Sequence, residues 1–233
     1  MLAVPLLLGV AASRPSPWQA VLSVTAISGY LASSAALDWI RARRRVYLEP
    51  AAVFGTVFAV TGCALLAAFP ELVAVAGVVG LAAALAGWVA MAGHPRSLVA
   101  GLAQVAQAVA LVPAAAVVAG PVDGSTVARA ALVAGLYLVS SVLVVRSMIR
   151  ERGNRRFLAA SIGYHAVVVA VEAWMLPWVY ALLALGLTLR AAALPALQVR
   201  LEGGARRLRP IHLGLVEAAS AALLLLVTFL VRF

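Results

Sequence analysis

Charged residues are scarce in this chain. Lysine is absent, aspartate and glutamate together number 8, and there is one cysteine, Cys63, which excludes an intrachain disulfide. Only 11% of the 233 residues are charged, whereas 65% are hydrophobic. A water-soluble domain would have too few polar side chains to cover its surface. The scarcity of charge therefore excludes the soluble classes of protein and indicates one that is solvated by lipid.

Common catalytic signatures are missing as well. The sequence contains no P-loop, no dinucleotide-binding glycine fingerprint, no zinc-ligand spacing and no serine or cysteine nucleophile motif. The net charge of +10 comes from arginines, and these gather mainly between apolar segments, as the positive-inside bias of membrane proteins predicts. We therefore expect membrane lipids, and not nucleic acid, as partners.

Apolar segments follow one another along the whole chain. A spanning helix needs roughly 20 mostly apolar residues, and proline or glycine separates most of the segments. We predict an all-α, polytopic, single integral membrane domain over residues 1–233 with about nine transmembrane helices. The predicted segments are Met1–Ala12, Trp18–Ile40, Pro50–Phe69, Leu72–Ala92, Leu98–Ala119, Ser125–Met148, Phe157–Leu176, Trp178–Leu197 and Ile211–Val231.

Arginines are distributed unequally between alternate connections. The connections after the second, sixth and eighth segments each hold four arginines and the connection after the fourth holds Arg96, whereas the others hold little beyond Arg14 and Arg129. This asymmetry predicts that the arginine-rich connections and the N-terminus face the cytoplasm of a bacterial inner membrane.

One motif occurs twice. Tyr30-Leu31-Ala32-Ser33-Ser34 returns as Tyr137-Leu138-Val139-Ser140-Ser141, and each copy ends in an Ile-Arg-x-Arg signature, at residues 40–43 and 149–152. We interpret the two copies as an internal duplication. The pseudo-repeated halves would cover about residues 1–93 and 94–200, with a final helix at 211–231.

The first segment is short for a spanning helix. Twelve residues at ~1.5 Å each cover about 18 Å of a ~30 Å hydrocarbon core. Val4-Pro5 precedes the first motif as Val112-Pro113 precedes the second, and the second pair lies well inside its helix. We therefore expect the first helix to be truncated and the natural start codon to lie upstream of Met1.

Two resemblances follow from these features. The opening Leu2-Ala3-Val4-Pro5-Leu6-Leu7-Leu8-Gly9, with a second helix that ends in an arginine run, resembles the YwiC-like family of bacterial membrane proteins. The family's His-Gly-Ala motif precedes the Val-Pro pair and would fall upstream of Met1. In topology the chain also resembles UbiA-type prenyltransferases, which have nine helices in two related bundles and functional loops after helices two and six.

The UbiA resemblance implies a scaffold that binds an isoprenoid or another lipid, with its anionic headgroup at the cytoplasmic side. If the chain is an enzyme, the resemblance implies prenyl transfer with Mg²⁺ held by carboxylates. UbiA enzymes carry paired Asp-rich motifs, whereas these loops offer only Asp38 and Glu151 as catalytic candidates. No metal site is assigned, and it stays open whether the chain is catalytic.

The basic loops supply one set of candidate binding residues. Guanidinium groups grip phosphate oxygens bidentately, so Arg41, Arg43, Arg150 and Arg152 could clamp an anionic headgroup. Ordinary positive-inside topology explains the same arginines without a ligand.

The second helix supplies another set. Tyr30, Ser34 and Asp38 share one face at i, i+4 spacing, which could line a cavity. Alternatively, Asp38 could pair with Arg41 or Arg43 while the hydroxyl groups join neighbouring helices. Arg146 lies a turn before its loop and could pair with Asp38.

Charges and histidine inside the later segments support a rival function, a transporter or lipid translocator with a polar site at membrane depth. His165 and Glu172 share one helix face, and Glu217 lies about two turns into the last segment. His165 could relay protons or bind a ligand, or it could be a packed histidine bonded to backbone. Glu217 could likewise serve only to join helices.

Overall fold

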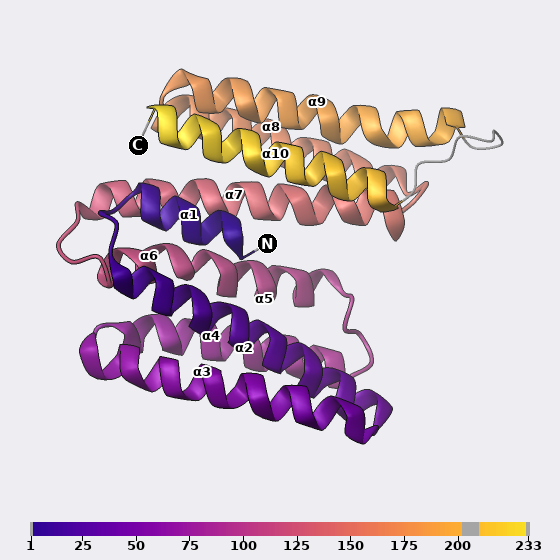
Figure 1. Cartoon of the computed structure of the whole chain (residues 1–233). Helices are drawn as coiled ribbons and strands as arrows, with labels where there is room; N and C mark the ends of the chain where they lie inside the picture. Colours follow the sequence, from indigo (N-terminus) through magenta and orange to yellow (C-terminus); the bar gives the residue numbers. More distant parts are fainter. Residues whose placement is uncertain (1, 202–209, 232–233) are drawn as a thin grey trace. The chain divides into compact units, whose positions relative to one another are not determined.

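The computed structural model describes residues 2–201 and 210–231, without the side chains of residues 41, 199, 201 and 210. The described residues form helices and turns and contain no strand. Figure 1 shows the elements, which are α1 (Ala3–Ala11), α2 (Pro17–Ala42), the 3₁₀ turn η1 (Arg45–Tyr47), α3 (Leu48–Ala68), α4 (Leu72–Met91), α5 (Leu98–Val109), α6 (Leu111–Val117), α7 (Gly124–Ile149), α8 (Arg155–Met175), α9 (Trp178–Leu201) and α10 (Pro210–Val231).

Eight helical stretches of the described residues are long and apolar enough to cross a membrane. They coincide with the eight longer predicted segments, so the prediction of an all-α, polytopic membrane protein is confirmed. Helix is the conformation that satisfies every backbone hydrogen bond within one segment, as hydrocarbon requires. The remaining predicted segment forms α1, whose 9 residues are too few to span a bilayer.

The spanning stretch Leu98–Val117 is interrupted in its second half. The sequence predicts one helix here, but α5 ends at Val109 and α6 begins at Leu111. Pro113 explains the break, because proline has no N–H to donate to the carbonyl four residues earlier, and its ring crowds that carbonyl. The regular bonding resumes where the Ala114 amide donates to the Ala110 carbonyl at 3.3 Å.

The chain divides into two compact units, residues 1–134 and residues 135–233, with the division inside α7. In the first unit, α2 packs along α3, α4 packs along α5, and α1 lies against α6 (Figure 1). Its buried apolar core includes side chains from α1 to α4 and from α6, namely Leu6, Leu22, Leu65, Leu72, Leu111, Ala114 and Ala115.

The approach of α1 to α6 is close because Gly9 has no side chain. A Cβ added at Gly9 would lie 2.6 Å from the Ala115 Cβ and 3.0 Å from the Val112 carbonyl oxygen. Small residues allow membrane helices to come together in this way. The pairing therefore buries α1 although it is short.

Gln19 fastens the turn between α1 and α2. Ser16 and Gln19 form a capping box, in which the Ser16 amide donates to the Gln19 side-chain oxygen at 3.1 Å. The Gln19 amide nitrogen donates to the Ser13 hydroxyl at 2.9 Å and to the Ala115 carbonyl of α6 at 3.1 Å. One buried side chain thus ties the start of α2 to α6.

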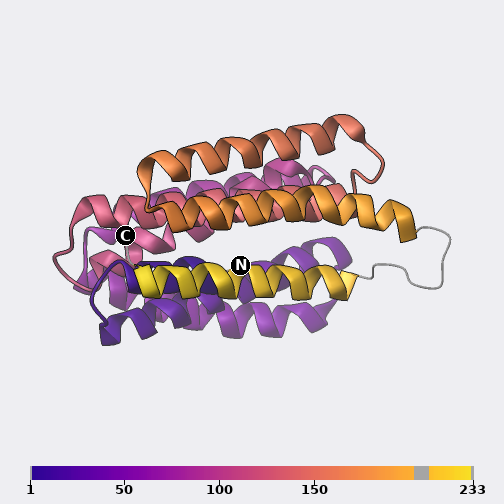
Figure 2. The same cartoon turned by 90° about the horizontal axis from the view of Figure 1, so that it is seen from above.

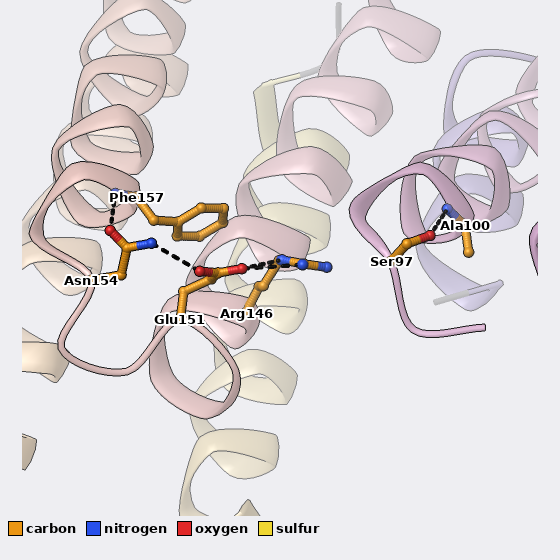
Figure 3. Close-up of polar contacts among 6 residues, drawn as sticks. All are labelled: Ser97, Ala100, Arg146, Glu151, Asn154 and Phe157. Carbon is orange, nitrogen blue, oxygen red and sulfur yellow. Dashed lines mark hydrogen bonds and ion pairs between the residues drawn. The ribbon is translucent and has the colours of Figure 1, made fainter. Parts of the chain in front are cut away.

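In the second unit, α9 packs against both α8 and α10, and successive helices run in opposite directions (Figures 1 and 2). The Tyr164 hydroxyl of α8 donates to the Leu136 carbonyl of α7 at 3.2 Å. Asn154 caps the start of α8, since its side-chain oxygen accepts from the Phe157 amide at 3.1 Å (Figure 3). Ser97 caps α5 of the first unit similarly, accepting from the Ala100 amide at 3.2 Å (Figure 3).

Large apolar side chains cover much of the molecular surface. Trp174, Leu81 and Leu230 are 87%, 76% and 74% exposed. So many exposed large apolar side chains are unusual on a soluble monomer. It is the surface expected of helices that face lipid.

Candidate functional site

An ion pair between two spanning helices is the centre of the polar interior of the second unit. Arg190 of α9 lies 2.8 Å from Glu217 of α10, measured from Nη1 to Oε1. The two side chains are only 9% and 16% exposed. Charges inside spanning segments are costly and rare, and they mark functional positions by default.

Hydroxyl groups from α7 and α10 surround this pair. The Ser141 hydroxyl donates to Glu217 Oε2 at 2.7 Å, and the Tyr137 hydroxyl donates to the Glu217 backbone carbonyl at 3.1 Å. Arg190 Nη1 donates to the Ser220 hydroxyl at 2.9 Å. We call these five residues, Tyr137, Ser141, Arg190, Glu217 and Ser220, the polar cluster.

The polar cluster lies at one depth in the predicted membrane. At ~1.5 Å of rise per residue, Arg190 is about 12 Å from the end of its span, which ends at Gln198. Glu217 is about 9 Å from the start of its span at Ile211. These two ends belong to the arginine-rich side of the chain. The polar cluster therefore lies within the ~30 Å hydrocarbon core and not at its surface.

Part of the Arg190 guanidinium lacks a partner within the described part of the chain. Its Nη1 forms the ion pair with Glu217 and donates a hydrogen bond to Ser220. By contrast, Nε and Nη2 are buried and make no hydrogen bond with the described residues. Buried polar groups are normally satisfied, so unpaired donors need an explanation. Buried donors of this kind are suited to binding an acceptor group of a ligand.

His165 of α8 is buried near the polar cluster, with 1% of its surface exposed. Its Nδ1 lies 2.7 Å from the Ser161 carbonyl oxygen, which can only accept, so Nδ1 carries the proton. Nε2 is then an acceptor in the neutral ring, and it is buried without a partner among the described residues. Arg190 and Glu217 both act on His165 electrostatically.

Glu172 lies near the C-terminal end of α8 and is 5% exposed. The hydroxyl groups of Tyr164 and Tyr180 both interact electrostatically with its carboxyl group. The Tyr180 hydroxyl donates to the Thr228 hydroxyl of α10 at 3.3 Å. Polar side chains therefore occur at two depths in the second unit, and α8 carries one at each depth, His165 and Glu172.

The loop between α7 and α8 holds another group of candidates (Figure 3). Arg146 Nη2 lies 3.1 Å from Glu151 Oε1, and the Asn154 amide donates to Glu151 Oε2 at 3.0 Å. These contacts, that of Asn154 first, hold the pKa of Glu151 below its usual range. Both carboxylate oxygens are thus engaged by neighbouring side chains, while Arg150 and Arg152 are exposed.

The candidates of the first unit lie along α2 and its end. Tyr30 is 57% exposed, Ser34 is half-buried and Asp38 is exposed. Arg43 has a left-handed backbone at φ 51°, and its guanidinium lies 5.6 Å from the centre of the Trp39 ring. The side chain of Arg41 is outside the described residues.

Two of the predicted associations join residues of different units. The pair of Asp38 with Arg146, and the clamp formed by Arg41 and Arg43 with Arg150 and Arg152, stay predictions. Arg146 does have a carboxylate partner within its own unit, Glu151. Over the described residues, no group of three or more histidine, cysteine, aspartate or glutamate side chains could hold a metal ion.

Glu217, His165 and the second copy of the repeated motif were predicted features of the sequence, whereas Arg190 was not predicted as a site residue. The signal for Arg190 was available, since it is an arginine near the middle of the predicted segment Trp178–Leu197. Ser220 follows Glu217 at i+3 and carried no signal of its own, because serine is common in membrane helices.

Comparison with known proteins bears on the first unit. No curated protein and no solved structure matches the chain. The polar cluster lies outside the part of the chain that a family model matches. That model, described as YwiC-like protein, matches residues 1–116, so the chain is similar to the YwiC-like family from its start through α6.

Proposed function

We propose that this chain is a YwiC-like membrane transporter whose substrate binds at the polar cluster of the second unit. The observation that carries the proposal is the Arg190–Glu217 ion pair inside two spanning helices, at 2.8 Å. Transporters typically bind substrates near the middle of the bilayer with polar groups from facing helices. A purely structural pair could be replaced by apolar side chains at little cost.

The environment of the pair supports a binding role. Ser141 and Tyr137 hold Glu217, whereas Nε and Nη2 of Arg190 and Nε2 of His165 are buried without a partner among the described residues. A site that served packing alone would have its polar atoms paired. The unpaired atoms are available to a substrate.

An internal duplication is part of the proposal, because transporters are commonly built from repeated halves. The bounds of two helix pairs recur at one constant spacing: α2 and α7 begin at 17 and 124 and end at 42 and 149, and α3 and α8 begin at 48 and 155 and end at 68 and 175.

A UbiA-like scaffold that holds an isoprenoid or an anionic lipid is the second candidate. It is favoured by the exposed guanidinium groups at the ends of α2 and α7, which include Arg43, Arg150 and Arg152. These would meet a headgroup at the predicted cytoplasmic surface. Prenyl transfer with Mg²⁺ would need carboxylates that are free to bind the ion, and Glu151 is engaged by Arg146 and Asn154.

Transport can be tested without knowing the substrate. Proteoliposomes are incubated with a bacterial metabolite extract and washed, and their contents are identified by mass spectrometry. We expect a small set of compounds to enter liposomes with the wild-type protein, and Glu217→Gln to reduce their entry at least tenfold. Glu71→Gln is the matched control, because Glu71 is an exposed carboxylate before α4, and it should transport normally.

Two results would contradict transport at this site. One is identical contents in protein-free and wild-type liposomes, and the other is unchanged uptake in the Glu217→Gln protein. Native mass spectrometry of the purified protein tests the second candidate. A bound isoprenoid diphosphate that is lost in the Arg43→Ala, Arg150→Ala double variant would favour the scaffold function over transport.

A further inference from the structure

We infer that the Nε and Nη2 edge of Arg190 binds an oxyanion, the carboxylate or phosphate group of the substrate. The inference rests on the proposed function and names the class of substrate. Of the three guanidinium nitrogens, Nη1 is the one that contacts partners among the described residues. Nη1 lies 2.8 Å from Glu217 Oε1 and donates to Ser220 at 2.9 Å.

The remaining edge of the guanidinium is the part suited to bidentate binding. Arginine has five N–H donors in one plane, and those on Nε and Nη2 point the same way from one side of the group. Carboxylates and phosphates accept two such parallel hydrogen bonds. In this protein both nitrogens are buried without a partner among the described residues.

Burial makes this edge a site and not a surface charge. The Arg190 side chain is 9% exposed, and it is fixed from the opposite side by Glu217, which Ser141 and Tyr137 hold in turn. A donor pair held in one orientation loses little conformational freedom when it binds. The ion pair therefore orients the guanidinium, and leaves the unoccupied edge for the ligand.

Competing cations and neutral groups fit this edge less well. The edge offers only donors, so it repels a cation, and a neutral carbonyl brings one oxygen to two parallel donors. Chloride accepts hydrogen bonds but has no pair of oxygens to match the two parallel donors. The chemistry therefore favours an oxyanion.

Binding is measured on the purified full-length protein in detergent, where no gradient is needed. Inorganic phosphate, acetate and dihexanoyl phosphatidic acid are the three probes, and they distinguish free phosphate, carboxylate and lipid phosphate. Chloride at equal ionic strength is the reference. We expect at least one probe to raise the unfolding temperature saturably, and Arg190→Lys to weaken that binding at least tenfold, because lysine keeps the charge but lacks the paired donors.

Arg129→Lys is the matched control, since Arg129 is an exposed arginine within α7, and it should bind the probe as the wild type does. Circular dichroism and gel filtration first compare the fold of the Arg190→Lys protein with that of the wild type. As a second measurement, the ¹⁵Nε resonance of Arg190 in the wild-type protein, assigned by its loss in Arg190→Lys, should shift when the probe is added.

The inference is overturned if no probe binds more tightly than chloride, if Arg190→Lys binds as the wild type does, or if the Arg190 ¹⁵Nε resonance stays unchanged at saturation. These results are separable from a failure of transport. Binding that depends on Arg190, without any uptake into proteoliposomes, would overturn the transporter and leave the oxyanion site standing.

Discussion

At the scale of single residues, the hydroxyl groups of Tyr137 and Ser141 connect the repeated sequence motif to the polar cluster. Both hold Glu217, one through its carboxylate and one through its backbone. Their counterparts in the first copy are Tyr30, which is 57% exposed, and Ser34. The same motif thus has different surroundings in its two copies, and among the described residues only the second copy contacts a charged partner in its own unit.

Some of these residues were visible in the sequence and others were not. Glu217 and His165 stood out because ionisable side chains are rare within apolar segments. The sequence could not tell that Glu217 pairs with Arg190, since helix packing decides which faces of α9 and α10 meet. Nor could it predict the tautomer of His165, which depends on the Ser161 carbonyl one turn earlier.

Asp123, in the connection before α7, provides a prediction on pH. Its carboxylate accepts hydrogen bonds from the hydroxyl of Ser125 and from the amide and hydroxyl of Thr126. These bonds, that of the Ser125 side chain first, lower its pKa from 3.8 to about 2. Because the folded pKa lies below the unfolded one, the stabilisation is complete above pH 3.8 and is lost as the pH falls through about 2.

The comparison is between the wild type and Asp123→Asn. Asparagine keeps the size of the side chain and can still cap the helix, but it does not ionise. We expect the wild type to unfold at the higher temperature at pH 6 and the difference to shrink as the pH falls from 3.8 through about 2. Other carboxylates titrate equally in both proteins, so a difference that is constant with pH would contradict the role given to Asp123.

At the scale of elements, the apolar pattern located the spanning helices within a few residues, because length and hydropathy alone decide whether a segment can cross a bilayer. It did not locate the break between α5 and α6. Pro113 was present in the sequence, but proline is often tolerated inside membrane helices, where neighbours satisfy the freed carbonyl. Whether a given proline kinks a helix or interrupts it depends on packing that the sequence pattern does not contain.

Gly9 tests the contact of α1 with α6. In Gly9→Ala the added methyl group would lie 2.6 Å from the Ala115 Cβ, closer than real contacts allow, so one helix must shift. We expect a loss of about 1–3 kcal/mol in the free energy of unfolding, the usual cost of overpacking. Unfolding by sodium dodecyl sulfate in mixed micelles, followed by circular dichroism, measures it.

Gly55 of α3 is the matched control, because nothing lies within 4 Å of a Cβ added there. Gly55→Ala should be neutral or should stabilise the protein by about 0.5–1 kcal/mol, since alanine restricts the unfolded chain more than glycine does. If the two variants changed stability by the same amount, the close packing of α1 on α6 would be wrong.

At the scale of the whole molecule, the arginine distribution predicts which loops face the cytoplasm. Cysteine labelling tests this on a Cys63→Ala background. Pro121→Cys lies in the α6–α7 connection, predicted to face outward, and Arg152→Cys lies in the α7–α8 connection, predicted to face inward; both positions are exposed. A membrane-impermeant maleimide should label only the Pro121→Cys protein in spheroplasts, and both proteins after lysis.

Labelling of Arg152→Cys alone in intact spheroplasts would reverse the predicted orientation. Labelling of both would mean that the two connections lie on the same side of the membrane. That result would contradict α7 as a spanning helix, because one crossing between the two connections places them on opposite sides. The orientation follows from charge in the loops, whereas the fold follows from the apolar segments. A reversed orientation would therefore leave the helices and the polar cluster unchanged.

The Arg190–Glu217 pair also sets the electrical work of transport under the proposed function. The empty pair has no net charge, whereas a pair with a bound monoanion carries one negative charge. When one elementary charge crosses the whole membrane, a potential of 100 mV, negative inside, changes its free energy by about 2.3 kcal/mol. The potential would therefore assist the loaded carrier in moving its anion out of the cell and would oppose uptake, so that net import would require a co-transported cation or a steep inward gradient.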